Sequence, residues 1–192
     1  MARTNSRMLP LGTPAPPFAL RDTATARTVA LGDFASSPVL LVAFICNHCP
    51  FVKHILNGLV GFARDLGVHG VAVVAISSND AASYPEDGPE KMARIATREQ
   101  FTFPYLYDES QEVAKAYQAV CTPDFFLFDH DRRLAYRGQF DASRPGNAIP
   151  VTGADLRAAC ELLLQGKLPP AEQTPSVGCS IKWKHGQEPD RT

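Results

Sequence analysis

Residues 39–50 constrain the fold most, because an apolar run there ends abruptly at two cysteines separated by two polar residues. Residues 39–45 are all apolar and largely branched, which is typical of a strand buried on both faces of a sheet. From Pro50 onward, apolar residues recur at three- and four-residue spacing, which predicts a helix. Proline suits the first turn of such a helix, where backbone N–H groups have no intrahelical partner. The sequence therefore predicts a strand and a helix that meet at Cys46 and Cys49.

These two cysteines are candidates for redox chemistry. The partial positive charge of a helix N-terminus favours thiolate, the form that attacks a disulfide or a peroxide. Two residues at this spacing in a tight turn also have Cα atoms within roughly 4.4 to 6.8 Å, as a disulfide requires. His48, which follows Asn47 between the cysteines, offers a positive charge or a mobile proton. Inert packing and zinc binding are the weaker alternatives, since the sequence contains no second Cys-x-x-Cys.

Composition limits the class of protein. A chain of 192 residues with 45% apolar residues is the size of one ordinary domain with a substantial core. Its 19 basic and 20 acidic residues are not clustered, so neither nucleic acid nor a membrane is an expected partner. We find no signal peptide or membrane-spanning run, which predicts a soluble cytoplasmic protein. Five cysteines in that compartment favour catalytic or redox use over structural disulfides.

The remaining periodicities predict an α/β fold. Residues 71–76 form a second wholly apolar strand, and two such strands joined by a helix make a parallel βαβ unit. The polar segment 77–89 is either a loop at the ligand-binding edge of the sheet or a solvated connector. The other expected elements are an edge hairpin of strands 18–20 and 28–31; the first helix to about Asp65, ended by Gly67; helices 89–100, 110–117 capped by Asp108 or Ser110, and 152–163 capped by Thr152; and strands 105–107, 125–128 and 134–136.

Three segments are expected along the chain. Residues 1–17 form an extended, proline-rich N-terminal segment, residues 18–166 form the domain, and residues 167–192 form a tail packed on it. Cys160 lies on the apolar face of the last helix and is expected in the core. Cys179, in a tail segment expected to be pinned to the body, is either part of that anchor, which we favour, or a resolving thiol.

The order of these motifs resembles the thioredoxin fold over about residues 18–165: a central mixed sheet flanked by helices, with an N-terminal hairpin extension. The resemblance implies that the Thr122-Pro123 peptide bond is cis and faces the dithiol, with Cys121 near Cys46 and Cys49. More closely, five motifs resemble a bacterial peroxiredoxin-like group within the alkyl hydroperoxide reductase and thiol-specific antioxidant (AhpC/TSA) redoxins. They are residues 44–54, 121–129, 136–138, 141–145 and 178–184.

The chain departs from thioredoxins around the dithiol. It has Ile45 where they carry an aromatic residue, Asn47-His48 where they carry Gly-Pro, and Leu40 where they carry a buried acid. A histidine before the second cysteine resembles the disulfide isomerase and oxidase branches. This likeness implies a more oxidising disulfide than that of thioredoxin.

It also departs from peroxiredoxins. Cys49-Pro50 matches the end of their motif, but Cys46 replaces a hydroxyl residue and Val42 replaces a proline. Arg137 or Arg144 is a candidate for the guanidinium that supports peroxide there, although a surface or structural role is favoured for each.

The sequence best fits a thiol-disulfide oxidoreductase without a cofactor. In this interpretation Cys46 attacks the substrate, Cys49 resolves the mixed disulfide, His48 tunes the thiolate, and Thr122 with Pro123 shapes the substrate groove. The expected partners are protein or small-molecule disulfides and a thiol reductant, and a homodimer is compatible with the sequence.

Two alternatives stay open. One is a thiol peroxidase in which Cys49 or Cys46 forms a sulfenic acid and another of Cys46, Cys49 or Cys121 resolves it. The other is a metal-binding or redox-sensing module that uses Cys46, Cys49, Cys121 and His48 as ligands.

Overall fold

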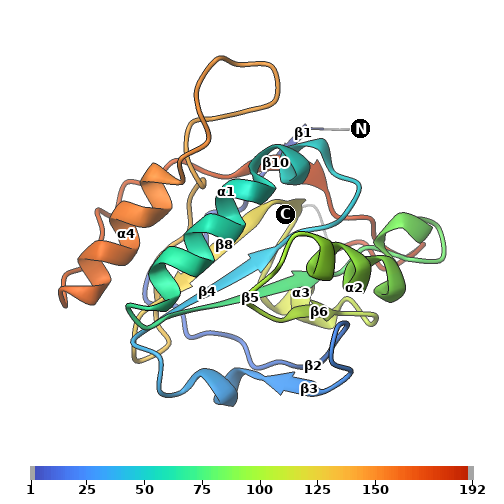
Figure 1. Cartoon of the computed structure of the whole chain (residues 1–192), viewed down its shortest axis with the longest axis horizontal. Helices are drawn as coiled ribbons and strands as arrows, with labels where there is room; N and C mark the ends of the chain where they lie inside the picture. The colour runs from blue at the N-terminus through green and yellow to red at the C-terminus, as the bar shows by residue number, and fades with distance from the viewer. Residues whose placement is uncertain (1–2, 190–192) are drawn as a thin grey trace.

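The computed structural model describes residues 3–189 and contains two sheets (Figure 1). The larger sheet is seven-stranded and mixed, in the order β3-β2-β6-β5-β4-β8-β9, and the smaller is three-stranded, in the order β1-β10-β7. The strands are β1 (Arg3–Asn5), β2 (Ala19–Asp22), β3 (Thr28–Ala30), β4 (Val39–Phe44), β5 (Val71–Ser77), β6 (Tyr105–Tyr107), β7 (Cys121–Thr122), β8 (Asp124–Phe128), β9 (Leu134–Tyr136) and β10 (Val177–Ser180). The helices are η1 (Leu31–Phe34), α1 (Pro50–Gly67), η2 (Pro85–Asp87), α2 (Pro89–Arg98), α3 (Glu112–Ala116) and α4 (Ala154–Leu164).

The centre of the larger sheet confirms the expected βαβ unit. Strand β4 pairs in parallel with β5 along its whole length and antiparallel with β8 on its other side. All of its residues are buried, which explains why the sequence of this strand is apolar throughout rather than alternating. The β2–β3 hairpin lies at one edge of the sheet and the β8–β9 hairpin at the other, both as expected.

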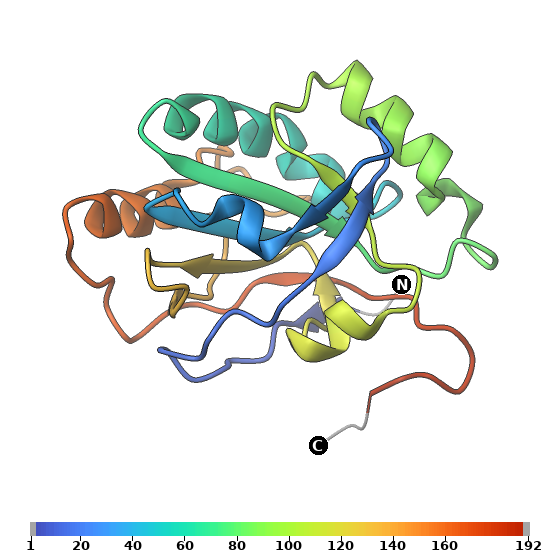
Figure 2. The same ribbon diagram turned by 90° about the horizontal axis from the view of Figure 1, so that it is seen from below.

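Helices cover the two faces of the sheet unequally. Helices α1, α2 and α4 pack on one face, whereas α3 and the C-terminal segment lie on the other (Figure 2). Cys160 of α4 is fully buried in the first of these cores, as expected from its position on the apolar face. Both faces are thus closed, and the site must lie at an end of the strands.

The helix boundaries differ from the sequence expectation where the backbone turns through positive φ. Helix α3 begins after Gln111, with φ 65°, instead of at a side-chain cap from Asp108 or Ser110. Asp108 nevertheless accepts a hydrogen bond from the N–H of Ala114, at 2.9 Å. Helix α4 begins after Gly153, with φ 68°, rather than at Thr152. In both cases a left-handed residue leads the chain into the helix. The hydroxyl groups of Ser110 and Thr152 still accept hydrogen bonds, each at 3.3 Å, from the first N–H group of α3 and of α4.

Further differences are at helix ends and in polar segments. Helix α1 continues through Gly67, and α2 ends at Arg98, two residues early. The 77–89 segment is buried at residues 77–80 and at Asp87, whereas residues 82–86 are exposed. It is therefore a solvated connector only in part. Within the described residues, no helix is long and apolar enough to cross a membrane.

The two ends of the chain meet in the smaller sheet. Strand β10, in the segment expected to be pinned to the body, pairs antiparallel with both β1 and β7. The N-terminal segment therefore contains a short strand, which the sequence analysis did not predict. Residues 1–2 and 190–192 of the expected terminal segments lie outside the described part of the chain.

Candidate redox site

The two cysteines lie at the junction of β4 and α1. Cys46 follows the last strand residues, and Cys49 is the N-cap of α1, with Pro50 in the first turn. The apolar strand fixes the first cysteine and the proline-started helix fixes the second. Both are reduced and almost fully buried, with 2% and 0% of their surfaces exposed.

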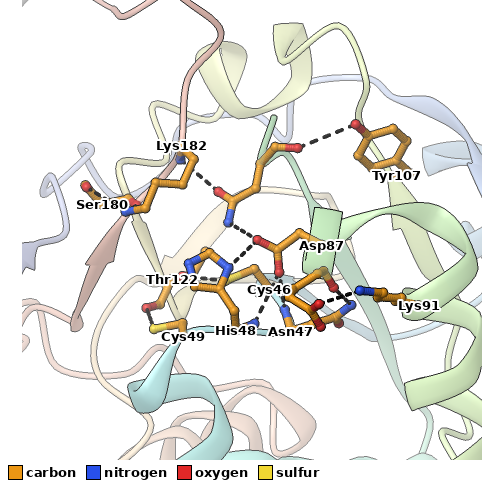
Figure 3. Close-up of polar contacts among 12 residues, drawn as sticks. Cys46, Asn47, His48, Cys49, Asp87, Lys91, Tyr107, Thr122, Ser180 and Lys182 are labelled. Atoms are coloured by element: carbon orange, nitrogen blue, oxygen red, sulfur yellow. Dashed lines mark hydrogen bonds and ion pairs between the residues drawn. The ribbon is translucent and has the colours of Figure 1, made fainter. Parts of the chain in front are cut away.

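Thr122 contacts the sulfur atoms of both Cys46 and Cys49 (Figure 3). Its hydroxyl lies 3.3 Å from Cys46 Sγ, and its carbonyl oxygen accepts a hydrogen bond from the Cys49 thiol at 3.0 Å. The peptide bond between Thr122 and Pro123 is cis, as the resemblance to thioredoxins implied. The polar groups of Thr122 thus face the dithiol directly.

Hydrogen bonding between the two thiols separates their acidities. The pKa of Cys49 is lowered to about 5, chiefly because Cys46 donates a hydrogen bond to it, and burial opposes this shift. The N–H of Val52, in the first turn of α1, also donates to Cys49. The pKa of Cys46 is raised, first because of the same hydrogen bond and then because of burial and the charge of Asp87. The pair therefore loses its first proton more readily than a lone thiol does.

The Thr122 contacts act against localising that thiolate on Cys49. The Thr122 carbonyl can accept only from a protonated Cys49, while the Thr122 hydroxyl can donate to an ionised Cys46. These contacts stabilise the tautomer with the proton on Cys49 and the charge on Cys46. We therefore describe the dithiol as one thiolate shared by two sulfur atoms.

Asp87 organises the backbone between the cysteines. One of its carboxylate oxygens accepts hydrogen bonds from the N–H groups of Asn47 and His48, at 2.8 and 3.2 Å. The other accepts from the side chain of Asn79 at 2.8 Å and contacts Nδ1 of His48. The sequence pattern did not indicate a role for Asp87. The only signal was its place in a polar segment after β5, and nothing local separates it from Glu86.

Asn47 and His48 are also held through their side chains. The Asn47 amide donates to the carbonyl of Glu86 at 2.7 Å and accepts from the hydroxyl of Tyr105 at 3.1 Å. The His48 ring stacks on Tyr84, with ring centroids 5.5 Å apart and planes inclined by 7°. Segment 77–89 therefore lies against the dithiol turn and restrains its backbone and its imidazole.

A surface pocket of about 470 Å³ reaches Cys46 but not Cys49. Residues 46–48 line this pocket together with further residues, some apolar and some of either charge. These further residues are Ile45, Val52, Lys53, Leu56, Asn57, Glu86, Ile95, Arg98, Glu99, Phe101 and Tyr105. Access from solvent is thus directed to the first cysteine of the pair.

The structure places Cys121 and Cys179 next to Thr122, Cys121 along the chain and Cys179 on the paired strand. Cys121 is buried in β7, and its thiol lies 3.6 Å from the carbonyl oxygen of Pro123. Cys179, in β10, is opposite Thr122 and shares a hydrogen bond with Cys49. Cys179 therefore interacts with Cys49 of the dithiol. The favoured expectation, that Cys179 only helps to anchor the tail, did not include this interaction.

The two arginines do not contact the dithiol in the part of the chain that the structure describes, although the charge of Arg137 acts on Cys121. Arg137 is buried, and its guanidinium nitrogens have no hydrogen-bond partner among the described residues. Burial lowers the pKa of Arg137 to about 10, and the charge of Asp124 opposes that shift. Arg144 donates to the carbonyl oxygens of Asp141 and Ser143, at 2.6 and 2.7 Å. Neither arginine has a recorded contact with Cys46 or Cys49 in the described structure.

The possible metal ligands are grouped differently from the sequence expectation. Within residues 3–189, Cys46, His48 and Asp87 are the one group whose ligand atoms could hold an ion, all within 4.8 Å of one another. Cys49 and Cys121 are not in it. Thiolate, imidazole and carboxylate suit zinc, but here His48 and Asp87 already bind each other.

The chain is similar in sequence to a known protein family. Residues 11–137 match the model of the AhpC/TSA family. The chain belongs to that family. Membership supports thiol-based oxidoreductase or peroxidase chemistry at a general level. A comparison with curated proteins gave no match.

Solved structures similar to this AhpC/TSA protein include two with over half of the residues identical. An uncharacterized conserved protein from Geobacillus kaustophilus is 55% identical, with a TM-score of 0.95 over 97% of this chain and 98% of the other. A hypothetical protein from Sinorhizobium meliloti 1021 is 52% identical, with a TM-score of 0.94 over 95% and 100%. A putative thiol:disulfide interchange protein DsbE from Chlorobium tepidum, 18% identical, has a TM-score of 0.62 over 82% and 99%. This last likeness concerns the fold alone.

Proposed function

We propose that this AhpC/TSA protein is a thiol-disulfide oxidoreductase that acts through Cys46 and Cys49. The observation that carries the proposal is the unequal access to two hydrogen-bonded sulfur atoms: the pocket reaches Cys46, while Cys49 is fully buried behind it. A substrate disulfide that enters the pocket meets Cys46 first, and Cys49 is next to Cys46 and can resolve the product. The mixed apolar and charged lining suits a disulfide carried by a peptide or a peptide-like small molecule.

The reaction then follows thiol-disulfide exchange. The Cys46 thiolate attacks one sulfur of the substrate disulfide, forms a mixed disulfide and releases the other substrate sulfur as a thiolate. Cys49 attacks Cys46 Sγ next, which releases the second substrate thiol and leaves a Cys46–Cys49 disulfide. His48, near Cys46 and oriented by Asp87 and Tyr84, can protonate a leaving thiolate. A thiol reductant returns the protein to its dithiol form.

Serine variants test the assignment. With a disulfide-bonded peptide as substrate, Cys46→Ser is expected to abolish turnover, and Cys49→Ser to accumulate a mixed disulfide on Cys46 that intact-mass spectrometry detects. Cys160→Ser is the control, since Cys160 is buried in α4 away from the dithiol. Turnover that survives Cys46→Ser would contradict the proposal.

The low pKa of Cys49 favours a second candidate, a thiol peroxidase. In that case the Cys49 thiolate attacks hydrogen peroxide, becomes a sulfenic acid and releases water, and Cys46 condenses with it to form the disulfide. Stopped-flow mixing with hydrogen peroxide measures this directly. A rate constant no higher than that of a free thiol would remove the peroxidase, and selective oxidation of Cys49 at a far higher rate would replace the first proposal.

A further inference from the structure

The C-terminal segment contributes a third sulfur to the site. Strand β10 pairs with β7 in a register that sets Cys179 opposite Thr122 and Ser180 opposite Cys121. Since Thr122 contacts both Cys46 and Cys49, this register brings Cys179 close to the dithiol. Cys179 is itself only 3% exposed.

Gly178 allows this close approach. A Cβ atom at this position would lie 2.0 Å from the carbonyl oxygen of Thr122, so any side chain would push β10 away from the cis peptide. The strand is also fixed on its other edge, where Arg3 pairs with Cys179 and Thr4 with Gly178. Cys179 is thus held against the dithiol by backbone pairing on both sides.

The thiol groups of Cys179 and Cys49 affect each other's pKa. The thiol and the backbone N–H of Cys179 both help to lower the pKa of Cys49, because each can donate to its thiolate. The pKa of Cys179 is raised to about 11, chiefly by burial and then by its hydrogen bond to Cys49 and the negative charge there, while Lys182 opposes the shift. Oxidation of Cys49 to a disulfide removes that charge, so Cys179 loses its proton more easily when an oxidised partner is present.

We propose that Cys179 is the third thiol of a relay and takes over the disulfide from Cys46. The Cys179 thiolate attacks Cys49 Sγ of the Cys46–Cys49 disulfide; the Cys49–Cys179 bond forms, the Cys46–Cys49 bond breaks, and Cys46 leaves as the thiolate. The proton from Cys179 passes to solvent. No electrons are gained or lost by the protein in this exchange. The relay rests on the proposed function, because the Cys46–Cys49 disulfide is its starting point. It leaves Cys46 at the pocket as a reactive thiolate.

Disulfide mapping after oxidation tests the relay. The protein is treated with oxidised glutathione, free thiols are alkylated at low pH, and peptides are mapped by mass spectrometry in wild type, Cys179→Ser and the Cys160→Ser control. We expect Cys49–Cys179 in wild type and in the control, with Cys46 alkylated. In Cys179→Ser we expect Cys46–Cys49 alone, with Cys46 alkylation lower by roughly tenfold.

Each outcome distinguishes the relay from the proposed function. Wild type that forms Cys46–Cys49 but never Cys49–Cys179 overturns the relay and leaves the oxidoreductase proposal standing. Wild type that forms neither bond overturns both. A Cys46→Ser variant gives a second measurement that does not depend on folding of Cys179→Ser, because mild oxidation of its remaining pair should yield Cys49–Cys179 directly; absence of that bond contradicts the relay.

Discussion

Two buried aspartates, Asp87 and Asp124, lie in regions of opposite character. Asp87 has hydrogen-bond donors on both carboxylate oxygens, supplied by the dithiol turn and by Asn79. Asp124 directly follows the cis proline. One of its carboxylate oxygens has no hydrogen-bond partner among the described residues, and the other accepts a long hydrogen bond, of 3.5 Å, from the N–H of Val120. Arg137 acts on it as a charge, without a recorded hydrogen bond.

This difference in hydrogen bonding gives the two carboxylates different roles. A carboxylate saturated with donors is a fixed scaffold, because moving it leaves several buried groups unpaired. A poorly satisfied carboxylate instead prefers its neutral form: burial raises the pKa of Asp124 to about 7, while Arg137 opposes the shift. Thus Asp87 shapes the site, whereas Asp124 changes charge near neutral pH.

The largest expected effect is at Asp87. Asp87→Ala leaves two backbone N–H groups, the His48 ring and the Asn79 amide without their acceptor, and should lower the free energy of unfolding by about 3 kcal/mol. Urea denaturation measures this loss. Glu86→Gln is the matched control, since Glu86 is the neighbouring acid and its side chain is 68% exposed. Equal effects of the two variants would contradict the scaffold role.

A pH-dependent effect is expected at Asp124. Its pKa is raised in the folded state, so its contribution to stability is fully present below about pH 4 and is lost as the pH rises through about 7. Asp124→Asn removes this titration. Relative to the variant, wild type should therefore lose on the order of 3 kcal/mol between pH 4 and pH 8, as measured by urea denaturation across that range. A difference between the two proteins that does not vary with pH would disprove the assignment.

A smaller effect is expected at Asn79, which joins the Asp87 region to the tail. Its side-chain N–H donates to Asp87 at 2.8 Å, and its side-chain oxygen Oδ1 accepts from the backbone N–H of Lys182 at 2.8 Å. Asn79→Ala should cost about 1 to 2 kcal/mol and increase hydrogen exchange at the Lys182 amide. Unchanged protection of that amide would show that the tail is held without this link.

The sequence predicted those parts of the fold that local pattern determines. The apolar run before Cys46 and the helical spacing after Pro50 are local, and the strand, the helix and their junction were correctly placed. The cis bond before Pro123 came from family resemblance rather than from spacing. The left-handed residues Gln111 and Gly153 at the helix entries were not predicted, because propensity indicates capping side chains but not left-handed backbone. The hydroxyl groups of Ser110 and Thr152 do bind first-turn N–H groups.

The rest of the site depends on contacts between distant segments. Asp87 is one of several acids in a polar segment, and its role arises only when η2 folds against the dithiol turn. The register that joins Cys179 to Thr122 is likewise set by pairing of the tail with β7, for which β7 offers only two residues. No local pattern could select either residue.

The seating of the tail has a practical consequence, because Trp183 is the chain's one tryptophan. It is partly buried against the second core, and the amides on either side of it, of Lys182 and Lys184, bind Asn79 and Gln111. Any displacement of β10 on formation of a Cys49–Cys179 bond alters the surroundings of this indole. Intrinsic fluorescence thus offers a label-free optical signal for following the oxidation of the tail in real time.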